Sequence, residues 1–172
     1  MVLADNLSRY VSLVYGDPAA MSGPNLVAAT VLFAIQLYMD FSGCCDIALG
    51  AARILGYDLI ENFDSPFESR SFGEFWRRWH VSMTGWFRDY VYIPLGGSRC
   101  STARTCRNLL VVFVLTGLWH GAAWQYVVFG LLHGLLLCAE RLGLRSLLEK
   151  LQLRDRTQLA IFYYQNLQSK ET

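Results

Sequence analysis

The stretch that decides the fold class is residues 109–139, LLVVFVLTGLWHGAAWQYVVFGLLHGLLLCA, which contains no Asp, Glu, Lys or Arg over 31 residues. About 18 such residues already indicate a transmembrane helix. The buried helical core of a soluble protein rarely leaves so many positions uncharged. The stretch therefore predicts an integral membrane protein of the all-α class, with several helices in the bilayer.

The same stretch is too long for one comfortable crossing. As a straight helix it would extend about 46 Å, against a hydrocarbon core of about 30 Å. Gly121 lies at the centre of WHGAAW, residues 119–124, and offers a natural break. We predict two helices that meet near His120, with the break at 120–123. Basic residues flank both ends, and a hairpin would place both flanks on one side, which the positive-inside rule makes cytoplasmic; they are Arg99, Arg104, Arg107, Arg141, Arg145 and Lys150.

Composition agrees with a membrane protein and excludes other classes. Of 172 residues, 53% are hydrophobic and 17% are charged, and the mean hydropathy is +0.27. A typical soluble domain has roughly 25% charged residues, and a disordered chain is far less apolar. The net charge of +1 provides no basic field for nucleic acid. The five cysteines match no zinc-ligand spacing, so we expect no metal site.

The first half of the chain predicts a short lead-in and a first span. Residues 1–24 are interrupted by charges and lack a signal-peptide pattern. Residues 25–46 form the span, and the helix is expected to continue to Gly56. Asp40 lies in its far half, and a carboxylate at membrane depth costs about 2.5–3.5 kcal/mol on insertion scales. Asp40 should therefore face a protein interior, a water-filled cavity or the interface.

Residues 71–90 predict an amphipathic helix at the membrane surface. Ser71 and Glu74 have capping-box spacing. Apolar residues then recur with helical spacing, at positions 72, 75, 76, 79, 83, 86, 87 and 90. Arg77 and Arg78 lie on the other side, where they would meet water or the phosphate of an acyl donor or lipid. Snorkelling at the headgroup layer and packing as a soluble amphipathic helix are the alternative interpretations.

Histidine is the strongest candidate for catalysis. His120 lies within the uncharged stretch, and a neutral imidazole there can accept a proton from a hydroxyl and pass it on. The alternative is a histidine that only bonds a neighbouring helix. His80 lies at the edge of the aromatic stripe and also fits an interfacial helix residue. His133 is interpreted as a helix-packing residue.

Four motif blocks follow one another along the chain: QLYMDFSG at 36–43, ENF at 61–63, FWRRWH at 75–80 continuing to WFRDYVYIPLGG at 86–97, and LTGLWHG at 115–121. Together they resemble the membrane-bound O-acyltransferase (MBOAT) family, and specifically its bacterial alginate O-acetyltransferase branch. Teichoic acid D-alanyl transfer proteins are more distant relatives. The resemblance implies a multi-span helical core, of which this chain would hold a middle to C-terminal part.

The resemblance also implies a reaction. An acyl group from a cytoplasmic donor, acetyl-CoA or a carrier-bound acyl group, would reach a hydroxyl of an exported polysaccharide such as alginate, directly or through periplasmic partner proteins. His120 matches the family's catalytic histidine and His80 a second motif histidine. The donor is a substrate, so no bound cofactor is expected. The implied location is the bacterial inner membrane, among lipids, with several crossings.

Other interpretations stay open at this stage. The chain could be an inactive remnant or a non-catalytic membrane subunit, because the family's members are longer. Asp40, Asp46 and His120 would also suit a transport or channel component. We expect residues 1–151 to form a partial MBOAT membrane domain and residues 152–172 a polar C-terminal tail.

Overall fold

The computed structural model describes residues 2–150, and the predicted tail at 152–172 lies outside them. The chain divides into two compact units. The first unit comprises the residues up to 65 together with 78–82, and the second comprises 66–77 and the residues from 83 onward. Within residues 2–150 the secondary structure is helical, apart from an isolated bridge between Phe63 and Trp79. The all-α class is confirmed.

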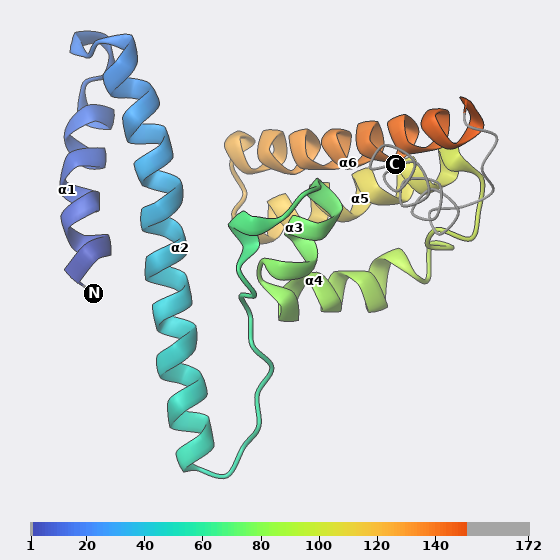
Figure 1. The fold of residues 1–172 in the computed structure, drawn as a ribbon, viewed down its shortest axis with the longest axis horizontal. Helices are drawn as coiled ribbons and strands as arrows, with labels where there is room; N and C mark the ends of the chain where they lie inside the picture. The colour runs from blue at the N-terminus through green and yellow to red at the C-terminus, as the bar shows by residue number, and fades with distance from the viewer. Residues whose placement is uncertain (1, 151–172) are drawn as a thin grey trace, which may run out of the picture. The chain divides into compact units, whose positions relative to one another are not determined.

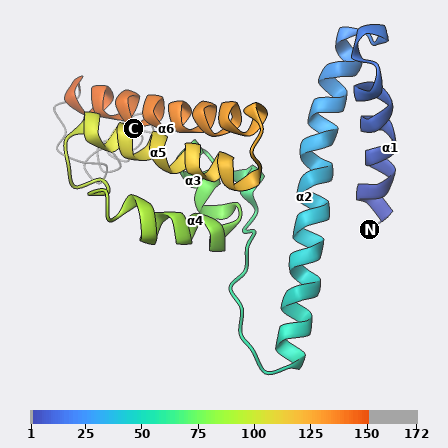
Figure 2. The same ribbon diagram turned by 180° about the vertical axis from the view of Figure 1, so that it is seen from behind.

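Two antiparallel helices make up most of the first unit (Figures 1 and 2). Helix α1, Val2–Gly16, runs beside the long helix α2, Gly23–Ile54, and a short 3-10 turn, η1 (Pro18–Ala20), connects them. The Tyr15 hydroxyl and Thr30 Oγ1 are 3.1 Å apart across this pair. As predicted, α2 continues well past the first span, and the chain leaves it at Gly56, whose φ of +81° favours glycine.

Among residues 2–150, two helices are long and apolar enough to cross a bilayer: Gly23–Ile54, and Trp124–Gly143 within α6. The surface of α2 is strongly apolar, and large side chains such as Val27, Phe33 and Leu37 are exposed along it. Soluble proteins rarely expose a continuous apolar surface of this kind. The length and the exposed apolar surface of α2 fit a membrane-embedded helix.

The predicted helix break within 109–139 is confirmed. Helix α5, Thr102–His120, ends at His120, and helix α6, Trp124–Lys150, begins four residues later. The two helices lie side by side as a hairpin in the second unit (Figures 1 and 2). The Cys138 thiol donates to the carbonyl oxygen of Cys106 at 3.5 Å. The beginning of α5 therefore lies beside the later part of α6, so the basic flanks of the hairpin are at the same end.

The single helix predicted over 71–90 is wrong. The structure divides it into α3 (Phe72–Arg78), α4 (Val81–Phe87) and a π-helical turn, η3 (Arg88–Tyr92), with a break at Trp79 and His80. The apolar stripe is also divided: Trp76, Met83 and Phe87 are buried, whereas Phe72, Trp86 and Tyr90 are exposed.

Residues of the preceding connector cause this break. The amide of Asp64 donates to the carbonyl oxygen of Arg78, and the amide of Val81 donates to the carbonyl oxygen of Asn62. These bonds replace the i to i−4 bonds that a continuous helix would need. The predicted helix start is correct, because Ser71 Oγ accepts from the Glu74 amide at 3.1 Å.

Trp76 forms the centre of the second unit. Its ring packs edge to face against Phe113 of α5, with centroids 5.0 Å apart, and against His133 of α6 at 5.2 Å. Phe129 completes the contact at 6.4 Å. Aromatic pairs at such distances are worth about 0.5–1.5 kcal/mol beyond the area they bury. Trp76 therefore holds α3 against the α5–α6 hairpin.

Candidate functional site

His120 is the last residue of α5, where the chain turns towards α6. Its Nδ1 lies 2.7 Å from the carbonyl oxygen of Thr116, one turn earlier. A carbonyl oxygen can only accept a hydrogen bond, so Nδ1 carries the proton. In the neutral ring the lone pair is then on Nε2. This arrangement gives His120 one defined basic nitrogen.

Aromatic rings hold the plane of the His120 imidazole. Tyr126 stacks on it with centroids 6.3 Å apart, and Phe129 meets it edge to face at 5.9 Å; both come from α6. Trp119 lies perpendicular to it at 5.0 Å. His120 itself is exposed in this chain. The ring is thus oriented by the hairpin and is accessible to another molecule.

Gly121 makes the close approach of Tyr126 possible. A β-carbon at this position would lie 2.5 Å from an edge carbon of the Tyr126 ring, closer than real contacts allow. The backbone of Gly121 is extended, with φ of 160° and ψ of 157°. The glycine is therefore needed for space beside the histidine rather than for an unusual backbone conformation.

His80 lies at the break between α3 and α4, and it belongs to the first unit. Its φ of +46° is unusual for a residue with a β-carbon. Its ring meets Phe41 of α2 edge to face, with centroids 4.7 Å apart. Phe41 also contacts Phe63, which packs on Trp79 at 5.0 Å. Sequence reasoning placed His80 on a regular helix, and the structure instead places it in an aromatic cluster at a turn.

The other predicted site residues differ in their surroundings. Arg77 is exposed, whereas Arg78 is half-buried and donates to the carbonyl oxygen of Asp64 at 3.2 Å. Asp40 is exposed on α2. By unit, His120 and Arg77 belong to the second, and His80, Arg78 and Asp40 to the first. Within the first unit, α2, the connector and residues 78–82 are brought together by the aromatic cluster around Phe63.

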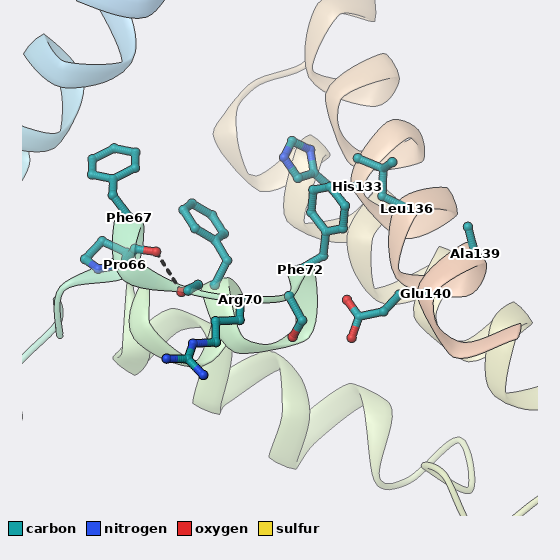
Figure 3. A pocket seen from close by; sticks show the side chains of 11 residues that line it. Pro66, Phe67, Arg70, Phe72, His133, Leu136, Ala139 and Glu140 are labelled. Carbon is teal, nitrogen blue, oxygen red and sulfur yellow. Dashed lines mark hydrogen bonds between the residues drawn. The ribbon is translucent and has the colours of Figure 1, made fainter. Parts of the chain in front are cut away.

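A pocket of about 620 Å³ lies within the second unit, between residues 66–75 and α6 (Figure 3). Glu140 projects from α6 towards this segment, where its Oε2 accepts from the Gly73 amide at 3.0 Å. His133 also lines the pocket, and its Nδ1 donates to the carbonyl oxygen of Phe129 at 2.9 Å. The predicted packing role of His133 is confirmed by its contact with Trp76.

Sequence reasoning missed two polar residues that organise these segments. Asn108 of α5 is fully buried, and its Nδ2 donates to the carbonyl oxygens of Leu95 and Gly97 at 3.0 and 3.4 Å. Asn62 accepts hydrogen bonds from residues near His80. The only sequence signal for Asn108 was an amide at the edge of an apolar stretch, and that for Asn62 was its place in a motif block.

No group of three or more His, Cys, Asp or Glu residues suited to a metal ion occurs among residues 2–150. The five cysteines are free thiols, and Cys44 and Cys45 are neighbours on α2. The described side chains that approach His120 are aromatic, and its Nδ1 is bonded to backbone. The arrangement thus leaves Nε2 of His120 as the ring nitrogen that can accept a proton from another molecule.

Comparison with known proteins provides independent information. The sequence profile of the membrane-bound O-acyltransferase family matches residues 3–165. The chain is 50% identical over 139 residues to the "Probable alginate O-acetylase AlgI" of Azotobacter vinelandii. It is 38% identical over 141 residues to the peptidoglycan O-acetyltransferase of Helicobacter pylori, and 36% identical over 113 residues to the teichoic acid D-alanyltransferase of Bacillus subtilis.

These matches cover most of the chain but only part of each relative. They include 81%, 82% and 61% of the chain, and 28%, 27% and 28% of the respective relatives. The chain thus spans a little over a quarter of the length of the curated relatives that it matches.

Proposed function

The chain belongs to the membrane-bound O-acyltransferase family, and from this premise we propose that it carries the acyl-transfer centre of a membrane O-acetyltransferase. The acceptor is a hydroxyl group of an exported polysaccharide, and the donor is a cytoplasmic acetyl thioester. Alginate is the first acceptor to test, because the relative that is 50% identical is named for alginate. The enzyme resides in the bacterial inner membrane and crosses it several times, with the basic ends of the α5–α6 hairpin in the cytoplasm.

The geometry of His120 carries this proposal. Because Nδ1 donates to the Thr116 carbonyl oxygen, Nε2 is the nitrogen that can accept a proton. Nε2 removes the proton from the acceptor hydroxyl as its oxygen attacks the acyl carbonyl carbon. The tetrahedral intermediate then collapses, the donor's sulfur leaves, and the imidazolium returns the proton to it. An alcohol is a poor nucleophile at neutral pH, and a positioned base contributes typically 10²–10⁴-fold.

Arg77 and Arg78 assist by binding the phosphates of the donor. Arg77 is exposed and able to reach a ligand, whereas Arg78 is partly engaged with the connector through the Asp64 carbonyl oxygen. Arg77→Gln should therefore raise the KM for the donor, with little change in the KM for the acceptor. Arg78→Gln should in addition lower the thermal stability. Equal donor KM values for wild type and both variants would contradict the donor-binding role.

Replacement of His120 tests the mechanism. In the full-length protein that contains this segment, we expect His120→Ala and His120→Gln to lose O-acetylation by about 10²-fold or more. The O-acetyl content of the exported polysaccharide and the membrane level of the protein are measured together. His133→Gln is the control, because His133 makes the same bond to the carbonyl oxygen one turn earlier. Near-normal acetylation by a well-expressed His120→Ala protein would overturn the assignment.

A further inference from the structure

The break at His80 places a residue with a β-carbon at φ +46°. Backbone conformations of this kind are unfavourable for a residue with a β-carbon and persist only where the surrounding structure enforces them. The enforcing contacts come from the connector, 18 residues earlier in the chain. These contacts relate the backbone conformation at His80 to the start of α4 and to the His80 imidazole.

Asn62 provides most of these contacts. Its carbonyl oxygen accepts from the Val81 amide at 3.1 Å. Its side-chain Oδ1 accepts from the Ser82 amide at 3.0 Å and from the Ser82 hydroxyl at 2.7 Å. Val81 and Ser82 begin α4, and their amides have no acceptor within that helix. Asn62 therefore acts as an N-cap supplied by a distant segment of the chain.

The same Oδ1 atom lies 3.3 Å from Nδ1 of His80. Because this atom already accepts from a backbone amide, it is the amide oxygen of Asn62 and not the nitrogen. Nδ1 of His80 must then be the donor and carry the proton. The lone pair of the neutral ring is on Nε2. In free histidine both tautomers exist, so the contact with Asn62 selects one of them.

An aromatic contact also determines the orientation of the His80 ring. Phe41 of α2 meets the His80 ring at 78°, and Phe41 in turn lies edge to face against Phe63, next to Asn62 in the connector. The connector thus controls both the protonated nitrogen, through Asn62, and the ring plane, through the aromatic cluster. A cap for α4 alone would not need the contact between Oδ1 and the imidazole.

We propose that Asn62 is a positioning residue for the acyl transfer, which holds His80 in the Nδ1-protonated tautomer and so makes Nε2 the basic nitrogen of the ring. This inference rests on the proposed acyl-transfer function for its effect on turnover. The selection of the tautomer is a separate property of the folded protein. Asn62 thus caps α4 through Val81 and Ser82, and its separate effect on turnover passes through the tautomer of His80.

The experiment uses the full-length protein with ¹³C- and ¹⁵N-labelled histidine, at about pH 8.5 where imidazole is neutral. Histidine chemical shifts distinguish the two tautomers, and the His80 signal is identified by its loss in His80→Gln. We expect the wild type to show the Nδ1-protonated form. Asn62→Ala should shift His80 towards the other tautomer and lower kcat by up to about 10²-fold, with a smaller change in KM. Asn62→Asp keeps the acceptor oxygen and should restore the tautomer.

Ser82→Ala is the matched control. It removes the 2.7 Å bond from the Ser82 hydroxyl but leaves the Asn62 contact with His80. A purely structural role for Asn62 predicts similar modest losses in Ser82→Ala and Asn62→Ala, with no change of tautomer in either. That result would overturn the proposal. If Asn62→Ala does not fold, Asn62→Asp still tests it, because a folded Asp variant without the Nδ1-protonated form would contradict it.

The outcome is distinguishable from failure of the proposed function. The tautomer is measured without turnover. An active His120→Ala protein would contradict the proposed mechanism of acyl transfer, but it would not affect the proposal that Asn62 selects the tautomer of His80. An unchanged His80 tautomer in Asn62→Ala, together with an inactive His120→Ala protein, would contradict only the positioning role of Asn62.

Discussion

Gly117 of α5 lies directly against the backbone of Tyr126 in α6, so closely that a β-carbon on Gly117 would collide with the Tyr126 carbonyl oxygen. Gly130 of α6 has the same relationship with the carbonyl oxygen of Phe113 in α5. Small residues allow helix backbones to approach in this way, and in membranes such packing is a main source of helix association. The two contacts determine how α6 lies beside α5, and hence where Tyr126 and Phe129 meet His120.

Gly117→Ala should destabilise the hairpin. Overpacking typically costs about 1–3 kcal/mol, more than the roughly 1 kcal/mol that alanine gains over glycine in a helix. We expect a lower midpoint of thermal unfolding in detergent and lower activity, because the rings around His120 shift. Gly143→Ala is the control, since nothing lies within 4 Å of a β-carbon there. Equal midpoints for the two variants would contradict the close packing.

Asn108→Ala should release the loop that follows η3. The carbonyl oxygen of Leu95 would lose its donor, and that of Gly97 would keep only the Cys100 thiol at 3.4 Å. A lost hydrogen bond that leaves a buried group unsatisfied costs about 1–3 kcal/mol. We expect faster proteolysis at residues 95–100, measured by mass spectrometry of the fragments. Asn25→Ala, at an exposed position on α2, should leave this rate unchanged. An unaltered rate in Asn108→Ala would show that other contacts hold the loop.

The hairpin predicts the same accessibility for its two basic ends. In a background without native cysteines, Arg104→Cys and Arg145→Cys should both react with a membrane-impermeant thiol reagent from the cytoplasmic side. Ala123→Cys, in the turn between α5 and α6, should not react from that side. Reaction of positions 104 and 145 from opposite sides would exclude the hairpin topology.

The ion pair between Arg88 and Asp89 predicts that the stability of the fold depends slightly on pH. Hydrogen bonds from the Arg88 guanidinium, the shortest 2.7 Å, lower the pKa of the Asp89 carboxyl below its ordinary value. A lowered pKa in the folded state means that the pair stabilises the protein above the ordinary carboxyl pKa of about 3.9. This contribution disappears as the pH falls through the lower folded value. The Asp89 side chain is exposed, with about half of its surface accessible to solvent, so the contribution is small.

Asp89→Asn measures that effect. We expect its unfolding midpoint to lie slightly below that of the wild type at about pH 6 and to approach it as the pH falls below the ordinary carboxyl pKa of about 3.9. Asp17→Asn, on the other unit, is the control for a general effect of charge removal. A wild-type advantage that grows as the pH falls would contradict the direction of the pKa shift.

Patterns within short stretches of sequence were enough to predict the membrane class, the break between α5 and α6, and the family. The uncharged stretch at 109–139 predicted a membrane protein, and its length together with Gly121 located the break between α5 and α6. Four motif blocks predicted the family, which the comparisons show. Local pattern sufficed there because length, charge and glycine act within one helix or one turn.

Only the tertiary structure revealed the break at His80 and the burial of Asn108. Both depend on hydrogen bonds between distant residues: Asn62 reaches His80 and Ser82, and Asn108 reaches back to Leu95. Local periodicity favoured one helix over 71–90, because every residue there is compatible with a helix by itself. A backbone amide bonds to the best-placed acceptor. For Val81 and Ser82 this acceptor is Asn62 of the connector, which lies outside the stretch 71–90 whose periodicity predicted the helix.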